Sequence, residues 1–445
     1  MIHIQYIIVT PNNLTAASLV IQYWLPREKV NPGVFIAVFL VCIVTINYFG
    51  VKFFGELEFW LSSVKVLVIL GLILLSLILA CGGGPDHHAT GFQFWNNPGA
   101  FHEYIATGAE GRFLAVYSTF TTAVFAYLGT ELVGVTVGEA ANPRRVIPRA
   151  IKLTFFRILI FYVVLVFLLG MLVPYNSDKL LAANKHSNSA AASPFVVAIE
   201  ISGIKVLPGL FNACVLIFVF SAANSDLYIA SRTLYGLAHE GKAPRIFRRT
   251  DTRGVPIYAL ALSVAFCLLA FLGVKTSSYT VFGYFVNLVT IFGLLTWISI
   301  LISHICFVRA RRAQNIPDSA LAYVAPLGMW GSVGALAFSI IIAFFKGFAL
   351  FCYQSTGRAS GKTPVFDTST FVTTYLGIPL YFVMFFGFKF VKGAHRVRPE
   401  TADLYSGKAR IDAEEEEFLA QEQARKGMPE TKAERIYRLT IGWAF

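Results

Sequence analysis

Charged residues are scarce in this sequence. Only 14% of its 445 residues are Asp, Glu, Lys or Arg, whereas a soluble domain usually carries about 25%. Hydrophobic residues make up 56% of the chain, and the mean hydropathy is +0.64. Because the shortage of charge takes the form of long apolar blocks, the sequence excludes an ordinary soluble protein and indicates an all-α polytopic membrane protein.

Several chemical signatures are also missing. The six cysteines show neither CxxC nor zinc-ligand spacing, and most lie in apolar blocks, where they are expected to pack without a metal. His87, His88 and His102 fall in a Gly-rich loop, for which a solvated loop is favoured over a metal site. No nucleophile with a base and an orienting group, and no phosphate-binding Gly loop, is evident. We therefore expect neither an enzyme nor an ATP-driven pump, and no metal.

The formal net charge is +12, but the basic residues lie at the ends of apolar blocks, where they set membrane topology. Nucleic-acid binding is therefore not expected. The N-terminus has no basic region or small-residue cleavage site, so no cleavable signal peptide is expected.

Ten apolar blocks follow one another along the chain, and about 20 residues suffice for a helix to cross a bilayer. The first is interrupted by Pro11, Asn12 and Asn13, which predicts a broken or incomplete helix. The blocks are 4–24, 34–51, 59–81, 113–138, 151–173, 206–238, 257–274, 281–308, 329–351 and 371–391.

Basic connections alternate between these blocks. Clusters follow the fourth, sixth, eighth and tenth blocks, the last one opening the tail, and the positive-inside rule places them in the cytosol together with both termini. Residues 1–391 are predicted to form the transmembrane domain and 392–445 a cytosolic tail. The tail holds a helix-favouring stretch at 413–426 and ends in apolar residues that could touch the membrane surface. Cytosolic regulators that bind this tail are possible partners.

The span 113–138 contains the run Ala126-Tyr127-Leu128-Gly129-Thr130-Glu131. A carboxylate in hydrocarbon is costly unless paired or hydrated, and Gly129 permits the helix to unwind beside it. The alternatives are a Glu131 held by a neighbouring helix for packing and a helix break that lines a substrate site. We favour the break.

Two further groups of polar residues lie within apolar blocks. Lys65 and Glu131 each lie about seven residues from a cytosolic block end, or roughly 10 Å deep. Burial disfavours a charged lysine, so Lys65 could exchange a proton, or it could snorkel to the interface. The cluster Ser221–Asp226, followed by Arg232, either lines an aqueous path or joins helices, and the two are not exclusive. Weaker cases of the same kind are Asn287, Thr290 and Thr296.

Long motifs carry a family resemblance. GTELVGVTVGEAANPRRVIPRAI at 129–151 and NSDLYIASRTLYGLAHEGKAPRIF at 224–247 closely resemble fungal-type amino-acid permeases, members of the amino acid–polyamine–organocation superfamily. CGGGP, FWNNPGAF and SPFVVAI are similar too. The resemblance implies an inverted-repeat (LeuT-like) carrier that imports amino acids with protons across the plasma membrane by alternating access. A proton would be the only coupling ion and no cofactor is implied.

The resemblance also implies roles for particular residues. The family's broken sixth helix matches 125–131, where the backbone and the side chains of Phe125, Tyr127 and Thr130 would face substrate. Lys65 matches a proposed proton-coupling lysine, and Glu131 is a second candidate for that role. The remaining implied substrate-binding positions are Ala126, Gly129, Glu131, Ser221, Asn224 and Thr296.

The N-terminal part departs from the family pattern. Family members carry two more spans, and most of a third, before the position that matches Thr15. We therefore expect a fold that lacks about the first two helices and part of the third. The alternatives to a transporting chain are a permease-like sensor or regulatory partner, and an inactive truncated fragment.

Overall fold

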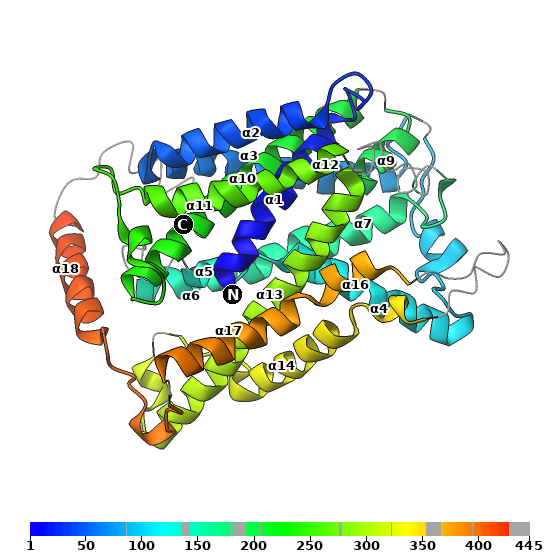
Figure 1. Ribbon diagram of the computed structural model, residues 1–445. Helices are drawn as coiled ribbons and strands as arrows, with labels where there is room; N and C mark the ends of the chain where they lie inside the picture. The colour runs from blue at the N-terminus through cyan, green and yellow to red at the C-terminus, as the bar shows by residue number, and fades with distance from the viewer. Residues whose placement is uncertain are drawn as a thin grey trace. The chain divides into compact units, whose positions relative to one another are not determined.

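The structure, a computed structural model, describes residues 1–85, 87–135, 143–178, 180, 193–204, 206–275, 278–321, 323–352, 366–393 and 395–426. Every regular element in this part of the chain is a helix (Figure 1). Within the described residues, nine helical stretches, some made of consecutive elements, are long and apolar enough to cross a membrane, and α2 is a shorter apolar helix. The expectation of an all-α polytopic membrane protein is therefore confirmed.

The main helices follow the apolar blocks in order. They are α1 (Ile2–Ile21), α2 (Pro32–Tyr48), α3 (Val51–Ala80), α4 (Gly108–Tyr127), α5 (Leu132–Val135), α6 (Pro143–Ile158), α7 (Leu165–Leu172), α9 (Pro194–Ile201), α10 (Leu207–His239), α11 (Ile257–Cys267), α12 (Leu272–Lys275), α13 (Ser278–Ala313), α14 (Gly328–Phe345), α16 (Thr368–Tyr375), α17 (Gly377–Lys392) and α18 (Lys408–Lys426). The π-helical turn η3 (Leu159–Val164) joins α6 to α7, and the 3₁₀ turn η5 (Leu268–Phe271) joins α11 to α12.

The chain divides into two compact units. The first comprises Met1–Leu128, Phe156–Ile302 and Val333–Ala394, and the second comprises Gly129–Phe155, Ser303–Ser332 and His395–Phe445.

Helix α1 lies at the centre of the packing in the first unit. It packs along α10 and also contacts α2 and α11 (Figure 1). Leu14 of α1 joins Ile36 and Ile43 of α2 and Leu227 of α10 in one buried cluster. Helix α1 carries no Asp, Glu, Lys or Arg, which suits its position among other helices.

The expected interruption of the first apolar block is not observed, because α1 continues through Pro11 to Ile21. An interior proline removes one backbone hydrogen bond and usually breaks or kinks a helix. Two nearby hydroxyls donate back to carbonyls of the same helix. The hydroxyl of Thr10 donates to the Tyr6 carbonyl at 2.9 Å, and the hydroxyl of Thr15 donates to the Pro11 carbonyl at 2.9 Å. The packing of α1 against α10, α2 and α11 stabilises the helical path through Pro11.

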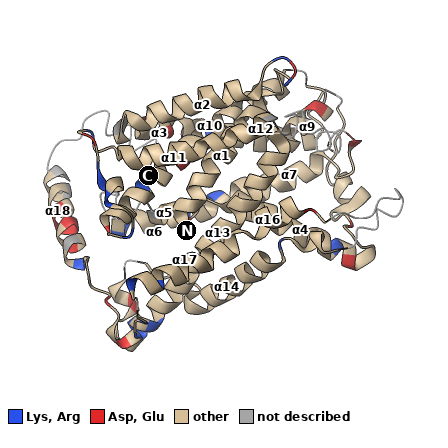
Figure 2. Cartoon of the chain, in the orientation of Figure 1, with Lys and Arg blue, Asp and Glu red and all other residues tan. Residues whose placement is uncertain are grey.

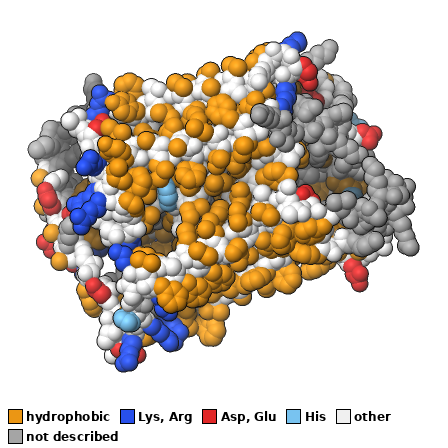
Figure 3. All heavy atoms as spheres, in the orientation of Figure 1, with side chains coloured by type: hydrophobic (Ala, Val, Ile, Leu, Met, Phe, Trp, Pro, Cys, Tyr) orange, Lys and Arg blue, Asp and Glu red, His pale blue; other side chains and the backbone are white. Residues whose placement is uncertain are grey.

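Helix α2 shows how the sequence sets a helix start and a lipid-facing side. The side chain of Asn31 accepts a hydrogen bond from the Gly33 amide at 2.8 Å, and Pro32 occupies the first turn, where its missing N–H costs nothing. Val34, Val38 and Val41 share one exposed face. Figure 3 shows hydrophobic side chains over the region of this helix. Such a face is suited to acyl chains.

Charge is distributed as a membrane protein requires. In Figure 2 the middle of α2, α11 and α14 is coloured as neither basic nor acidic residues, and acidic residues follow one another along α18. The long exposed run of apolar side chains on α3 and α17 fits the same environment.

The second unit contains the tail helix. The predicted helix-favouring stretch at 413–426 lies within α18. Arg144, at the start of α6, forms ion pairs with Asp412 and Glu415 of α18. The amide of Gln314 donates to the carbonyls of Pro399 at 3.1 Å and Ala402 at 2.8 Å. The apolar end of the tail lies outside the described residues.

Candidate functional site

A three-residue polar cluster joins α3 to α10 inside the first unit. Glu58 and Lys65 are seven positions apart on α3, about two helical turns, so their side chains share a face. The ammonium of Lys65 lies 3.2 Å from the Glu58 carboxylate and donates to the hydroxyl of Ser221 at 2.6 Å. That hydroxyl lies 2.7 and 2.8 Å from the two carboxylate oxygens of Glu58. The three groups thus form a closed hydrogen-bonded ring.

The ring is largely shielded from solvent. The side chains of Lys65 and Glu58 are only 26% and 21% exposed to solvent, and Ser221 is fully buried. Two opposite charges in such a site stabilise one another, and removing either one leaves the other poorly solvated. An ionic group within a membrane-spanning helix indicates a functional site by default.

The sequence identified two of these three residues but did not predict their contact. Lys65 and Ser221 lie far apart in the sequence, and the structure brings them together. Glu58 was missed because the third apolar block was drawn from residue 59, whereas α3 begins at Val51. The available signal was the spacing of seven residues between two opposite charges on one helix.

The other polar residues of α10 reach different helices. Asn47 of α2 donates through its side-chain amide to the Asn224 side-chain oxygen at 3.0 Å. Asn13 of α1 donates to the Asp226 carboxylate at 2.6 Å. Ser221, Asn224 and Asp226 point in different directions because each residue turns a helix by about 100°. The cluster therefore joins α10 to three neighbouring helices. A role of the same residues in lining an aqueous path is not exclusive of this and stays a prediction.

The expected helix break is present after α4. The helix ends at Tyr127, Leu128 is extended, and Gly129 has a φ of +95°, a conformation that side chains disfavour. The amide of Gly129 donates to the Glu131 carboxylate at 3.1 Å. Thr130 lies in the turn between them, and α5 starts at Leu132. The break thus replaces the regular backbone pairing of a helix by the local hydrogen bonds of a turn.

The aromatic residue before the break is held in place within the first unit. The ring of Tyr127 stacks on that of Tyr162, with centroids 5.2 Å apart, and the Tyr162 hydroxyl donates to the Ala126 carbonyl at 3.0 Å. Phe125 is half-buried on α4. Contact of Phe125, Tyr127, Gly129, Thr130 and Glu131 with substrate stays a prediction.

The polar residues of α13 use their hydroxyls locally. Thr296 is buried and donates to the Phe292 carbonyl at 2.9 Å, and Thr290 donates to the Val286 carbonyl at 2.6 Å. The Asn287 carbonyl accepts a hydrogen bond from the Lys346 ammonium at 2.8 Å. Lys346 follows α14 directly, and among the described residues no carboxylate lies within ion-pair distance of it. The sequence analysis did not single out this lysine.

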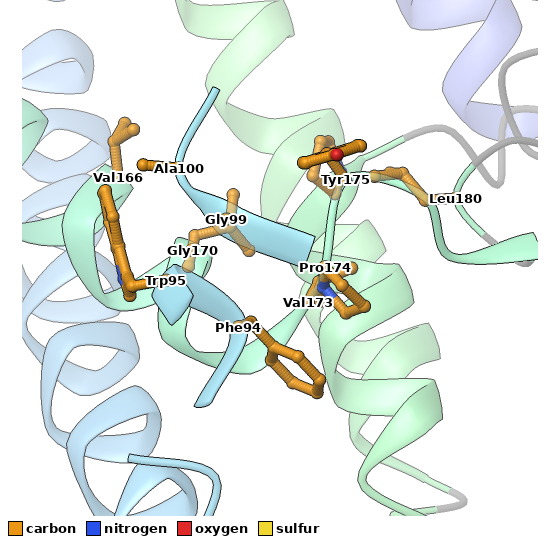
Figure 4. A pocket seen from close by; sticks show the side chains of 12 residues that line it. Phe94, Trp95, Gly99, Ala100, Val166, Gly170, Val173, Pro174, Tyr175 and Leu180 are labelled. Carbon is orange, nitrogen blue, oxygen red and sulfur yellow. The ribbon is translucent and has the colours of Figure 1, made fainter. Parts of the chain in front are cut away.

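A separate apolar cavity of about 280 Å³ lies in the first unit (Figure 4). Phe94, Trp95 and Gly170 of α7 line it, and a Cβ added at Gly170 would lie 2.9 Å from the Trp95 ring. None of the predicted site residues lines this cavity. It is therefore distinct from the polar cluster on α3 and α10.

The sequence model of the family described as amino acid permease matches residues 1–398. This chain belongs to the amino acid permease family. The permease is 52% identical over 424 residues to the dicarboxylic amino acid permease of Saccharomyces cerevisiae, covering 95% of this chain and 68% of that protein. The lysine-specific permease of S. cerevisiae is 42% identical, covering 88% of this chain and 62% of that protein. The general amino-acid permease of the same organism is 38% identical, covering 99% of this chain and 71% of that protein.

Membership of the family makes the chain an amino-acid transport protein and not an enzyme. It also agrees with the multi-pass helical fold. The permease spans about two thirds of the length of these relatives.

Proposed function

We propose that this permease imports amino acids together with protons across the plasma membrane, with both termini in the cytosol. The observation that carries the proposal is the ring of Glu58, Lys65 and Ser221, which contains two groups able to exchange protons within membrane-spanning helices. The alternating basic connections support the orientation. The helix break at Gly129 also supports the proposal, because secondary transporters bind the charged groups of their substrates at breaks in membrane-spanning helices.

Amino acids with an acidic side chain are the substrate class that we propose. Two observations support this choice. The relative with 52% identity is named for dicarboxylic amino acids. Lys346 also provides a half-buried positive charge next to α13, the helix that carries Thr296, and no described carboxylate neutralises it. A cation in such a site attracts an anionic ligand more strongly than an exposed one does.

The test is uptake of labelled glutamate, aspartate, glutamine and lysine by cells that lack their own permeases and express this chain. Uptake should exceed that of empty cells, rise when the medium is acidified, and collapse with a protonophore. Lys65→Ala and Glu131→Ala should each reduce it to background. Uptake that is unchanged in both variants would show that the assigned roles are wrong.

The same assay separates the other two functions that the sequence left open. A sensor would bind amino acids at the membrane without accumulating them in cells. An inactive fragment would neither bind nor accumulate them and would be lost from the membrane. The surface level of a tagged chain, measured alongside uptake, distinguishes these outcomes.

A further inference from the structure

We propose that Glu58 is the carboxylate that takes up the coupled proton, and that its protonation releases the contact between α3 and α10. This inference rests on the proposed proton-coupled uptake and names the residue that carries the proton. It differs from a role for Lys65 alone, because it makes the ion pair the unit that responds to protons.

The surroundings of Glu58 fit an ionised carboxylate. Its oxygens lie within hydrogen-bond distance of the Ser62 hydroxyl at 3.2 Å, the Lys65 ammonium at 3.2 Å and the Ser221 hydroxyl at 2.7 Å. All of these groups can donate, and an ionised carboxylate can only accept. The arrangement is therefore complementary to the charged form of Glu58.

Protonation of Glu58 would remove that complementarity. The neutral acid carries a donor of its own, so at least one of the present donors loses its acceptor. The negative charge that compensates the Lys65 ammonium disappears at the same time. A largely shielded ammonium without a counter-charge is unfavourable, so Lys65 must then move its charge toward water, and the pair has gained one proton. The two residues consequently respond to protons as a pair.

The Glu58–Lys65 pair of α3 contacts α10 through Ser221, so the protonation state of the pair affects the contact between the two helices. Ser221 belongs to α10, while Glu58 and Lys65 belong to α3. Two turns further along α10, the ring of Tyr228 stacks on that of Phe54 of α3, with centroids 4.2 Å apart and planes inclined by 7°. Once the polar ring opens, this stack and apolar contacts alone would hold the polar face of α3 on α10. A proton on Glu58 therefore favours separation of the two helices.

No other described titratable side chain competes for Glu58. The elements packed against α3 are α2, α7, η3 and α10. Most charged or titratable side chains of these elements contact a group other than Glu58. The contacts are Tyr48 with Arg253, Tyr162 with Ala126, Asp226 with Asn13, Arg232 with Tyr228, and Tyr235 with His239. The remaining titratable side chains are the thiols of Cys42 and Cys214. Within the described chain, Lys65 is the charged partner of Glu58.

Glu56 provides a matched control. It lies two residues away on α3, is exposed, and accepts a hydrogen bond from the Trp60 indole at 3.2 Å. Its removal changes the net charge of the helix as much as removal of Glu58 does, without touching the ring.

The experiment compares Glu58→Gln with Glu56→Gln in membrane vesicles, after proton-dependent accumulation has been measured for the unaltered chain. Glu58→Gln keeps the size and accepting oxygen of the side chain but cannot take up a proton. We expect it to lose pH-dependent accumulation by about tenfold or more. It should retain exchange of labelled for unlabelled amino acid, which requires no net proton movement. Glu56→Gln should behave like the unaltered chain.

The outcomes separate the inference from the proposed function. If the unaltered chain shows no proton-dependent accumulation, the proposed function fails and this inference fails with it. If the unaltered chain is proton-dependent and Glu58→Gln keeps the same pH profile, only the inference fails. Should Glu58→Gln not reach the membrane, Glu58→Asp decides: it keeps a proton site, and retention of pH dependence at a lower rate supports the inference, whereas loss of pH dependence overturns it.

Discussion

At Gly129 the backbone takes a conformation that other residues rarely adopt. Its φ is +95°, and the residue starts the turn in which its own amide donates to Glu131. Alanine at such an angle costs about 1–2 kcal/mol. We expect Gly129→Ala to lower the unfolding temperature in detergent and to reduce uptake, because the break would be reshaped. Gly134→Ala is the control, since that glycine in α5 has open space around it. Equal behaviour of the two variants would contradict the role given to Gly129.

Lys346 tests the preference for acidic side chains. Replacing it with methionine keeps a long side chain and removes the charge that lies beside the Asn287 carbonyl. We expect Lys346→Met to lower the ratio of glutamate to glutamine uptake by about tenfold, the factor that corresponds to ~1.4 kcal/mol. Lys346→Arg keeps the charge and should largely keep the ratio. An unchanged ratio in Lys346→Met would remove this lysine from substrate selection.

Individual residues also show what a sequence can reveal about the site. Lys65, Ser221 and Glu131 stand out because each is polar within an apolar run. Their partners do not stand out. Glu58 lies in the N-terminal part of α3, where other charged residues also occur, and Lys346 lies directly after the apolar run of α14. Both became visible only once helix packing placed them beside another element.

At the scale of elements, α10 organises the first unit through its polar residues. The Asn13–Asp226 hydrogen bond, at 2.6 Å, joins it to α1. A double-mutant cycle of Asn13→Ala and Asp226→Ala should give a coupling of about 0.5–3 kcal/mol in unfolding free energy. The control cycle pairs Asn13→Ala with Ser231→Ala, because Ser231 donates within its own helix. Additive effects in the first cycle would show that the bond does not stabilise the packing of α1 on α10.

The tail helix α18 is held in the second unit by charge. Lys408 and then Arg144, through hydrogen bonds, hold the pKa of Asp412 below its ordinary value. A carboxyl whose pKa is lower in the folded state stabilises the fold at a pH above its unfolded pKa of about 3.9. This stabilisation is lost as the pH falls through the lower pKa of the folded state. We therefore expect α18 to be protected at neutral pH and released only below about pH 4.

Hydrogen exchange of α18 measures this contact. Arg144→Gln should accelerate exchange in 408–426 at neutral pH, because Asp412 and Glu415 both lose their ion pair with α6. Arg396→Gln, an exposed position in the same unit, should leave exchange unchanged. High salt should act in the direction of Arg144→Gln, since exposed ion pairs are screened. Exchange that is the same in both variants would contradict the docking role of Arg144.

Element boundaries explain where sequence reasoning succeeded and where it stopped. Apolar length predicted most helices, because a backbone in lipid must satisfy its own hydrogen bonds. It placed the start of α3 eight residues late, since helices continue beyond the apolar run into charged sequence. It also overrated Pro11, because the packing of α1 against other helices outweighs a local preference.

At the scale of the whole molecule, composition predicts the class and ordered motifs predict the family. Neither specifies which polar residues meet, because contacts such as Asn47–Asn224 depend on how the helices pack. The central claim is that the paired charges of α3 couple amino-acid uptake to protons.

Proton movement caused by substrate tests that claim most directly. Adding glutamate to weakly buffered cells that express the permease should make the medium more alkaline, as protons enter with the amino acid. Lys65→Ala should abolish this change while its surface level stays the same. Glutamate uptake without any accompanying alkalinisation, equal in the unaltered chain and in Lys65→Ala, would contradict the account.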